Sequence, residues 1–222
     1  MDIQQAINQF IRGEGKNKGR KPGERYSSFD YCYYYFYSFH KQNKQSELAD
    51  EKNIQTSCLH LGFYLASWGM LRGSSFLLEK SLGHYRNLII AISKMNPELW
   101  EVDLDNYDES NIELLLNCKQ QIIEALGREN NPSDTLVTKI MLGVFANVPA
   151  FDQYVKKTFG VWVVNKNSLL KIRDFYNINK SVIDSFKIYT FDFLTSQETD
   201  IIYTRAKLLD MYGFIYGSQN QF

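Results

Sequence analysis

The sequence IQTSCLHLGFYLASW, residues 54–68, carries the clearest helical pattern in the chain. Five of its apolar residues are spaced by four, three, four and three positions, which places them on one face of a helix. They are Ile54, Cys58, Leu61, Leu65 and Trp68. The opposite side carries Gly62 and Ala66, which are small enough to let another helix approach closely. We therefore expect this helix to lie at the centre of the fold.

The segment before it, residues 29–40, reads FDYCYYYFYSFH, and seven of the nine residues from 31 to 39 are aromatic. A helix that is aromatic on every side is not an ordinary surface helix, and a buried tyrosine hydroxyl needs a hydrogen-bond partner. These side chains either fill a groove of the core or form a platform on which nucleic acid bases stack. In the second interpretation, Tyr31 and Tyr34 bind the bases. In both, a helix that begins near Ser27 or Ser28 packs beside the central one.

Helical periodicity recurs in at least seven segments, while no hairpin signal appears. The sequence therefore predicts a mainly α-helical protein: a single compact multi-helix domain of residues 1–222, with eight or nine helices and little or no strand. Residues 161–164, VWVV, are the only segment that favours a strand. Residues 195–198, TSQE, have the pattern of a capping box, which predicts that the last helix begins there.

The charges of the chain balance, since 25 Lys and Arg residues stand against 25 Asp and Glu residues. No global field therefore draws the chain to nucleic acid or to an anionic membrane, and such a partner must meet a local patch. Gly, Ser or a charge breaks each apolar stretch before it could span a membrane, and the N-terminus lacks the features of a signal peptide. We therefore expect a cytoplasmic protein without a membrane partner.

The three cysteines are odd in number, far apart and surrounded by apolar residues. They are Cys32, Cys58 and Cys118. This pattern is typical of reduced, packed thiols and not of a disulfide framework. We therefore predict that all three are free and that Cys58 is buried, because it is in register with Leu61 and Leu65.

Two loops carry most of the unbalanced charge. Residues 12–25 contain six basic and two acidic residues together with four glycines, which predicts a mobile loop of net charge +4. Its candidate phosphate contacts are Lys16, Lys18, Arg20 and Lys21. Residues 98–110 contain six acidic residues and no basic one, which predicts an exposed acidic loop whose charges are solvated.

Standard catalytic signatures are absent from the sequence. There is no Walker loop, dinucleotide glycine fingerprint, nucleophile elbow, paired-cysteine zinc motif or His-Glu-x-x-His motif. The histidines are single residues on three expected helices, and they are His40, His60 and His84. We therefore predict no metal site and no cofactor.

The junction between two expected helices, residues 68–75, reads WGMLRGSS. Arg72 can bind an anion through two hydrogen bonds, assisted by backbone N–H groups at the start of the following helix. In this interpretation Trp68 forms a wall of the site, and Ser74 and Ser75 contact the substrate. In the alternative, the junction is a simple helix corner and Arg72 caps the carbonyl groups of its own helix.

Residues 136–143, LVTKIMLG, place Lys139 inside an otherwise apolar helix, and Asp152 lies in the first turn of the next helix after Pro149. A lysine removed from water can act as a nucleophilic amine, and a neighbouring carboxylate can orient a substrate or a water molecule. In the alternative, Lys139 extends its amine to solvent and Asp152 accepts hydrogen bonds from helix N–H groups.

The pattern of residues 134–152 resembles a segment of helix-hairpin-helix DNA glycosylase-like proteins, in which a lysine and an aspartate flank the base pocket. The resemblance implies that Lys139 is a catalytic nucleophile and that Asp152 is its carboxylate partner. The whole pattern from residues 26–32 through residues 65–70 also resembles that of bacterial helical proteins of unknown function.

Two functions from different classes remain open. The first is recognition of a nucleic acid or nucleotide, with or without glycosylase-like base chemistry at Lys139 and Asp152. The second is a non-catalytic helical module that binds a protein partner, in which the aromatic residues are core or interface. Convergence of Arg72, Lys139 and Asp152 on one concave pocket would favour the first function, and scattering of these residues would favour the second.

Overall fold

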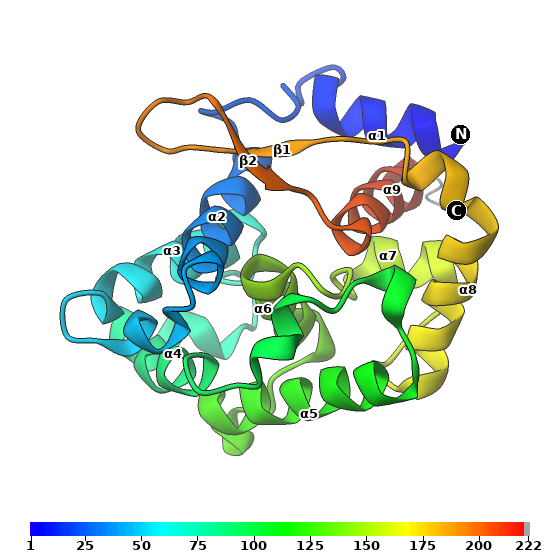
Figure 1. The fold of residues 1–222 in the computed structure, drawn as a ribbon. Helices are drawn as coiled ribbons and strands as arrows, with labels where there is room; N and C mark the ends of the chain where they lie inside the picture. The colour runs from blue at the N-terminus through cyan, green and yellow to red at the C-terminus, as the bar shows by residue number, and fades with distance from the viewer. Residues whose placement is uncertain (220–222) are drawn as a thin grey trace.

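The computed structural model describes residues 1–219 and shows a mainly α-helical protein (Figure 1). Within these residues there are nine α-helices and one two-stranded sheet, which confirms the predicted fold class. The helices are α1 (Ile3–Arg12), α2 (Ser28–Lys41), α3 (Ile54–Ser67), α4 (Arg86–Ile92), α5 (Glu109–Leu126), α6 (Asp134–Phe145), α7 (Gln153–Phe159), α8 (Lys166–Ile183) and α9 (Arg205–Gln219). The strands are β1 (Tyr189–Phe191) and β2 (Glu198–Ile202). Short 3-10 helices are η1 (Arg25–Ser27), η2 (Gln45–Ala49), η3 (Phe76–Glu79), η4 (Leu82–Tyr85), η5 (Pro97–Trp100), η6 (Leu104–Asn106) and η7 (Arg128–Asn130).

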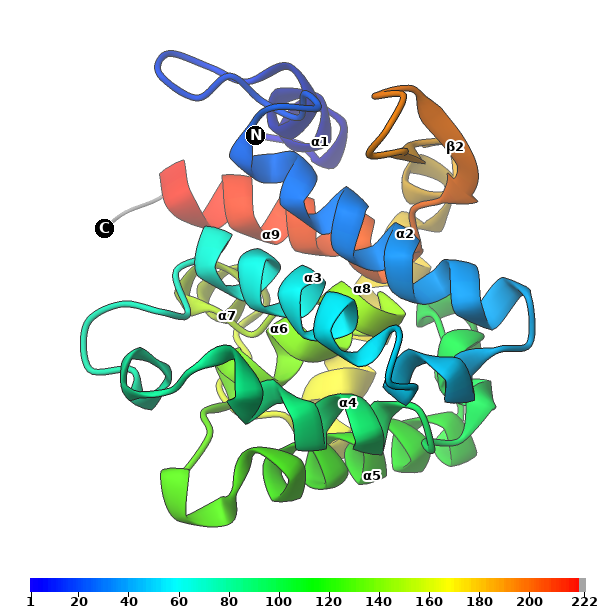
Figure 2. The ribbon, with the colours of Figure 1, turned by 90° about the vertical axis from the view of Figure 1, so that its left-hand side faces the viewer.

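Helix α6 is the centre of the fold. Helix α3 lies between α2 and α4 on one side of the molecule, and α6 packs against α2 and α3 from within (Figure 2). All residues of α6 from 136 to 145 are buried, whereas α3 leaves Leu59 and Phe63 exposed. The prediction that residues 54–68 form the central helix is therefore wrong. A helix that is apolar on every side is buried more deeply than one with an apolar stripe, and α6 is the more deeply buried of the two.

The close approach of α3 and α6 depends on Gly143. A Cβ atom at this position would lie 2.4 Å from the Tyr64 ring, which is closer than real Cβ contacts allow. Helix α9 in turn packs against α1 and α7.

Within residues 1–219, none of the helices has the length and apolarity that crossing a bilayer requires.

Helix α2 fills a core groove with one side of its aromatic surface. The side chains buried there include Phe29, Cys32, Tyr33 and Phe36. Hydroxyl groups nearer the surface have partners: Tyr31 donates to the carbonyl oxygen of Pro22 at 2.9 Å, and the hydroxyls of Tyr35 and Ser57 lie 2.9 Å apart. The aromatic helix is therefore largely core, although Tyr31 and Tyr34 are only half-buried.

The strand was predicted in the wrong place. Residues 161–164 are not assigned to a strand, whereas β1 and β2 pair as an antiparallel hairpin that packs against α2. The predicted capping box at residues 195–198 lies in the turn of this hairpin and continues into β2. Asp192 explains the turn, because its carboxylate accepts hydrogen bonds from two backbone N–H groups that follow it.

Arg20 anchors the basic loop to the rest of the protein, and its side chain is only 4% exposed. Its guanidinium donates to Asp30 (Nη2–Oδ1 2.8 Å) and to the hydroxyl of Tyr203 (Nε–Oη 2.8 Å), and it lies over the Phe191 ring at 3.9 Å. The prediction of Arg20 as a mobile phosphate contact is therefore wrong, because this cation neutralises a buried carboxylate. The predicted contacts that are exposed are Lys16, Lys18 and Lys21.

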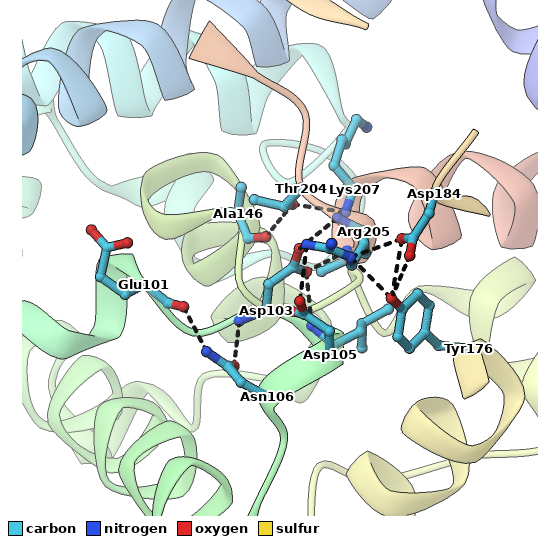
Figure 3. A network of polar contacts seen from close by, with 12 residues as sticks. Glu101, Asp103, Asp105, Asn106, Ala146, Tyr176, Asp184, Thr204, Arg205 and Lys207 are labelled. Carbon is cyan, nitrogen blue, oxygen red and sulfur yellow. Dashed lines mark hydrogen bonds and ion pairs between the residues drawn. The ribbon is translucent and has the colours of Figure 1, made fainter. Parts of the chain in front are cut away.

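The acidic segment of residues 98–110 is only partly exposed, because Asp103 points into the protein (Figure 3). Its carboxylate accepts the backbone N–H groups of the first two residues of α9 at 2.8 and 2.9 Å, which caps that helix. Arg205 in turn pairs with Asp103 and Asp184 and donates to the Tyr176 hydroxyl. This network joins the acidic segment to α8 and α9. The prediction that the charges of this segment are solvated is therefore wrong for Asp103.

The three cysteines are free and buried, as predicted. Burial raises the pKa of each thiol, so little reactive thiolate exists at mildly alkaline pH. We expect a thiol reagent to label the native protein far more slowly than the protein unfolded in guanidinium, in which all three thiols should react. Rapid native labelling of Cys118, located by peptide mapping, would contradict this packing.

Candidate functional site

Four of the predicted site residues line one cavity of about 580 Å³, which we call the Lys139 pocket. They are Trp68, Arg72, Lys139 and Asp152. The pocket lies where the end of α3 and the loop after it face α6 and the start of α7. Other lining side chains that carry a charge or an aromatic ring are Arg25, Tyr154 and Phe214. The structure therefore brings Arg72, Lys139 and Asp152 together.

Lys139 and Asp152 form a partly buried ion pair in this pocket. The Lys139 side chain is 5% exposed, and its Nζ lies 3.5 Å from Oδ2 of Asp152. The other carboxylate oxygen, Oδ1, accepts the backbone N–H groups of Tyr154 and Val155 and thereby caps α7. The alternative in which Lys139 extends into solvent is therefore wrong, whereas Asp152 does accept hydrogen bonds from helix N–H groups. One carboxylate serves both the helix and the amine.

Two threonines of α6 fix the position of Asp152. The hydroxyl of Thr138 donates to a carbonyl oxygen of its own helix at 2.7 Å and accepts the Phe151 N–H at 2.8 Å. The hydroxyl of Thr135 donates to the Phe151 carbonyl oxygen at 2.7 Å. The residue before Asp152 is thus bonded to α6 through both its backbone groups, which holds the carboxylate against the helix that carries Lys139.

Trp68 forms a wall of the pocket and contacts a second buried lysine. Its ring lies 5.2 Å from Nζ of Lys139 and 5.5 Å from Nζ of Lys207. Tyr26 stacks on it at 5.5 Å, and the Phe214 ring meets it edge to face at 5.5 Å. The indole Nε1 of Trp68 is buried and has no hydrogen-bond partner among the described residues.

Sequence reasoning missed Lys207, which pairs with Asp210 inside α9. Their Nζ and Oδ2 atoms lie 2.8 Å apart, and the two side chains are 1% and 9% exposed. Asp210 also accepts the backbone N–H of Ala150 at 3.1 Å. A signal existed, because residues 206–213 place a lysine and an aspartate three positions apart in an otherwise apolar helix. We interpret this pair as support for the pocket, since it joins α9 to the segment that precedes Asp152.

The Lys139 pocket carries a net positive charge. Its charged lining residues are the cations Arg25, Arg72 and Lys139 and the carboxylate Asp152. The Arg25 guanidinium lies 5.3 Å from the Trp68 ring. Arg72 is exposed and forms no ion pair with any residue in the described part of the chain. The local field therefore favours an anionic ligand, although the whole chain is neutral.

Gly69 shapes the loop that presents Arg72. It has a φ of +75°, which other residues rarely adopt, and an added Cβ would lie 2.8 Å from the Arg72 Nε atom. The carbonyl groups near the end of α3 accept the N–H groups of residues 68–70. Arg72 is not bonded to these carbonyls in residues 1–219, so the alternative of a helix cap is wrong. Its guanidinium remains available to a ligand.

The remaining predicted contacts lie outside this pocket. Ser74 and Ser75 line a neighbouring cavity of about 570 Å³, which shares Arg72 with the Lys139 pocket. Tyr31 lines a third cavity, and Tyr34 packs half-buried against the core. The candidate residues therefore divide into one converging group and several that belong to adjoining surfaces.

Comparison of the chain with models of known protein families, with curated proteins and with solved structures finds no match. What the protein does must therefore be argued from the geometry of the Lys139 pocket.

Proposed function

We propose that this chain binds a nucleotide in the Lys139 pocket, either free or as a unit of a nucleic acid. The observation that supports this most is the convergence of Arg72, Lys139 and Asp152 on one cavity beside the Trp68 ring. Cationic side chains suit a phosphate group, and aromatic side chains suit a flat base. The volume of about 580 Å³ lies in the range of small-ligand sites.

Arg72 is the residue best suited to bind the phosphate. It is exposed and has no ion-pair partner in residues 1–219, and a guanidinium can bind phosphate through two parallel hydrogen bonds. Arg25 supplies a second guanidinium at the same cavity. The base of the nucleotide lies toward the aromatic rings of Tyr154 and Phe214, which line the same cavity.

The pocket also supports a reaction of the Lys139 amine with an abasic nucleotide. In this step Asp152 accepts a proton from the ammonium group, and the free amine attacks the C1′ aldehyde of the sugar. A C–N bond forms, the carbonyl oxygen takes up two protons and leaves as water, and an imine joins the lysine to the sugar. The Nζ–Oδ2 distance of 3.5 Å places the proton acceptor beside the amine.

Binding of thymidine 5′-monophosphate, measured by isothermal titration calorimetry at low salt, tests the nucleotide proposal. Replacing Arg72 by glutamine is expected to weaken this binding by about tenfold to a hundredfold, because a hydrogen bond to a charged group contributes ~1.5–3 kcal/mol. Thymidine, which lacks the phosphate, should bind weakly to both proteins, and raising the salt concentration should weaken binding of the nucleotide to the unchanged protein.

Arg86→Gln is the matched control, because Arg86 is also an exposed arginine but does not line the Lys139 pocket. This variant should bind the nucleotide as tightly as the unchanged protein. Absence of binding across the four thymine, adenine, cytosine and guanine nucleotides, or an equal loss in both variants, would contradict the proposal and favour the non-catalytic interaction module.

A further inference from the structure

A second cavity, which we call the α3 groove, adjoins the Lys139 pocket and has a volume of about 610 Å³. The two cavities share Arg25 and Ser67. The α3 side of the groove is one stripe of the helix, formed by Thr56, Leu59, His60, Phe63 and Ser67. At 1.5 Å per residue this stripe is about 17 Å long. The groove and the pocket are therefore neighbouring cavities that meet at Arg25.

The α3 groove exposes large apolar side chains to solvent. On α3, Phe63 is 72% exposed and Leu59 is 51% exposed, and on the β-hairpin Phe193 is 68% exposed. Tyr31 and His60 add two further rings to the lining. Apolar side chains gathered in this way on the surface of a folded chain mark a binding site. The number of rings favours an occupant that is itself flat and aromatic.

Charges around the groove favour an anionic occupant. Arg25 is the cation that lines it, and the lining carboxylate, Glu24, pairs with Lys18 at 3.1 Å. Asp192, next to Phe193 in sequence, uses its carboxylate to accept N–H groups of the hairpin turn. The exposed rings thus share the groove with the Arg25 guanidinium, and Lys18 pairs with a residue of its lining. Aromatic rings beside a cation are typical of sites for single-stranded nucleic acid.

We propose that the α3 groove binds the nucleotide adjacent to the one in the Lys139 pocket, so that the ligand of this protein is a single-stranded nucleic acid. This inference rests on the proposed function of the pocket. The second base stacks on Phe63 and Phe193, and Arg25 binds the phosphate between the two nucleotides, because Arg25 lines both cavities.

The dependence of affinity on ligand length tests this inference. Calorimetry compares thymidine 5′-monophosphate with single-stranded thymidine oligonucleotides of increasing length. The unchanged protein is expected to bind a short oligonucleotide at least about tenfold more tightly than the mononucleotide, because stacking of one more base on an aromatic side chain has an effect of this size. Replacing Phe63 by alanine should remove this gain and leave the mononucleotide affinity unchanged.

Trp162→Ala is the matched control, since Trp162 is 65% exposed and lines neither cavity. It should retain the gain in affinity with length. Arg72→Gln, in contrast, should weaken the binding of mononucleotide and oligonucleotide alike. Phe63→Ala therefore reports on the groove, and Arg72→Gln reports on the pocket.

Four outcomes would overturn the inference. If affinity does not rise with length, or if Phe63→Ala retains the rise, the groove does not bind a nucleotide, while mononucleotide binding that depends on Arg72 would still support the pocket. If Phe63→Ala changes only the self-association of the protein in sedimentation velocity, the groove is a protein interface. Absence of binding by both ligands would remove the pocket as well.

Discussion

Replacing Arg20 by methionine is expected to lower the free energy of unfolding by about 3–5 kcal/mol, because the change leaves a buried carboxylate without its cation. Asp30 is fully buried, and its Oδ1 atom accepts hydrogen bonds from Arg20 and from the Tyr203 hydroxyl. Methionine can fill much of the volume of the arginine stem but cannot balance the charge. Unfolding in guanidinium, followed by circular dichroism, measures the loss.

The destabilisation by Arg20→Met should shrink as the pH falls. Burial raises the pKa of Asp30, and removal of Arg20 would raise it further. A carboxyl group with a raised pKa binds its proton more readily in the folded chain than in the unfolded one, so protonation favours the folded state. Stability of the variant is therefore regained at low pH and lost as the pH rises through the folded-state pKa.

Arg128→Met is the matched control for Arg20→Met. The ion pair of Arg128 with Glu124 is exposed, with side chains that are 66% and 50% exposed. Exposed pairs on a helix contribute little, so this variant should unfold at almost the same guanidinium concentration as the unchanged protein. A loss in Arg20→Met that is no larger than the loss in this control would show that Asp30 does not need its cation.

The sequence predicts a mainly helical fold because apolar residues repeat with the helical period in many segments. Helix α3 begins at Ile54 as predicted, and α6 occupies the segment around Lys139. The hairpin is missed because β1 has only three residues, too few for an alternating pattern to be recognised. The depth of each helix is also not predicted, since it depends on which helices pack around it.

The candidate site is predicted where its residues are close in sequence. Lys139 lies in α6 and Asp152 caps the next helix, α7, only 13 residues later, so the segment that joins the two helices suffices to bring them together. The contact of Arg20 with Tyr203 joins residues 183 positions apart, and no local pattern indicates it. Arg25 is overlooked for a similar reason, because only the folded chain shows that it lines both cavities.

Replacing Lys139 by methionine is expected to abolish the borohydride-dependent crosslink between this protein and single-stranded DNA that contains an abasic site. Borohydride delivers a hydride to the carbon of the lysine–sugar imine, which becomes a secondary amine that survives denaturing electrophoresis. Methionine keeps the apolar stem of the side chain and removes only the amine. The gel measures the crosslinked fraction, which should fall to the background of the reaction without borohydride.

Two further variants separate the amine from its surroundings. Lys94→Met should crosslink like the unchanged protein, because Lys94 is exposed and does not line the Lys139 pocket. Asp152→Asn keeps the cap of α7, since asparagine caps helices as well as aspartate does. It removes the proton acceptor, so the crosslink should form at least about a hundredfold more slowly.

A crosslink that persists in Lys139→Met would place the reacting amine at another lysine. Lys207 is the next candidate, because its Nζ also lies near the Trp68 ring, but it is 1% exposed and held by Asp210 at 2.8 Å. Reaction there would require α9 to move, whereas Lys139 already lines the pocket. Absence of any crosslink in the unchanged protein would contradict the proposed reaction of the Lys139 amine. It would not contradict nucleotide binding, which depends on Arg72 and is tested separately by Arg72→Gln.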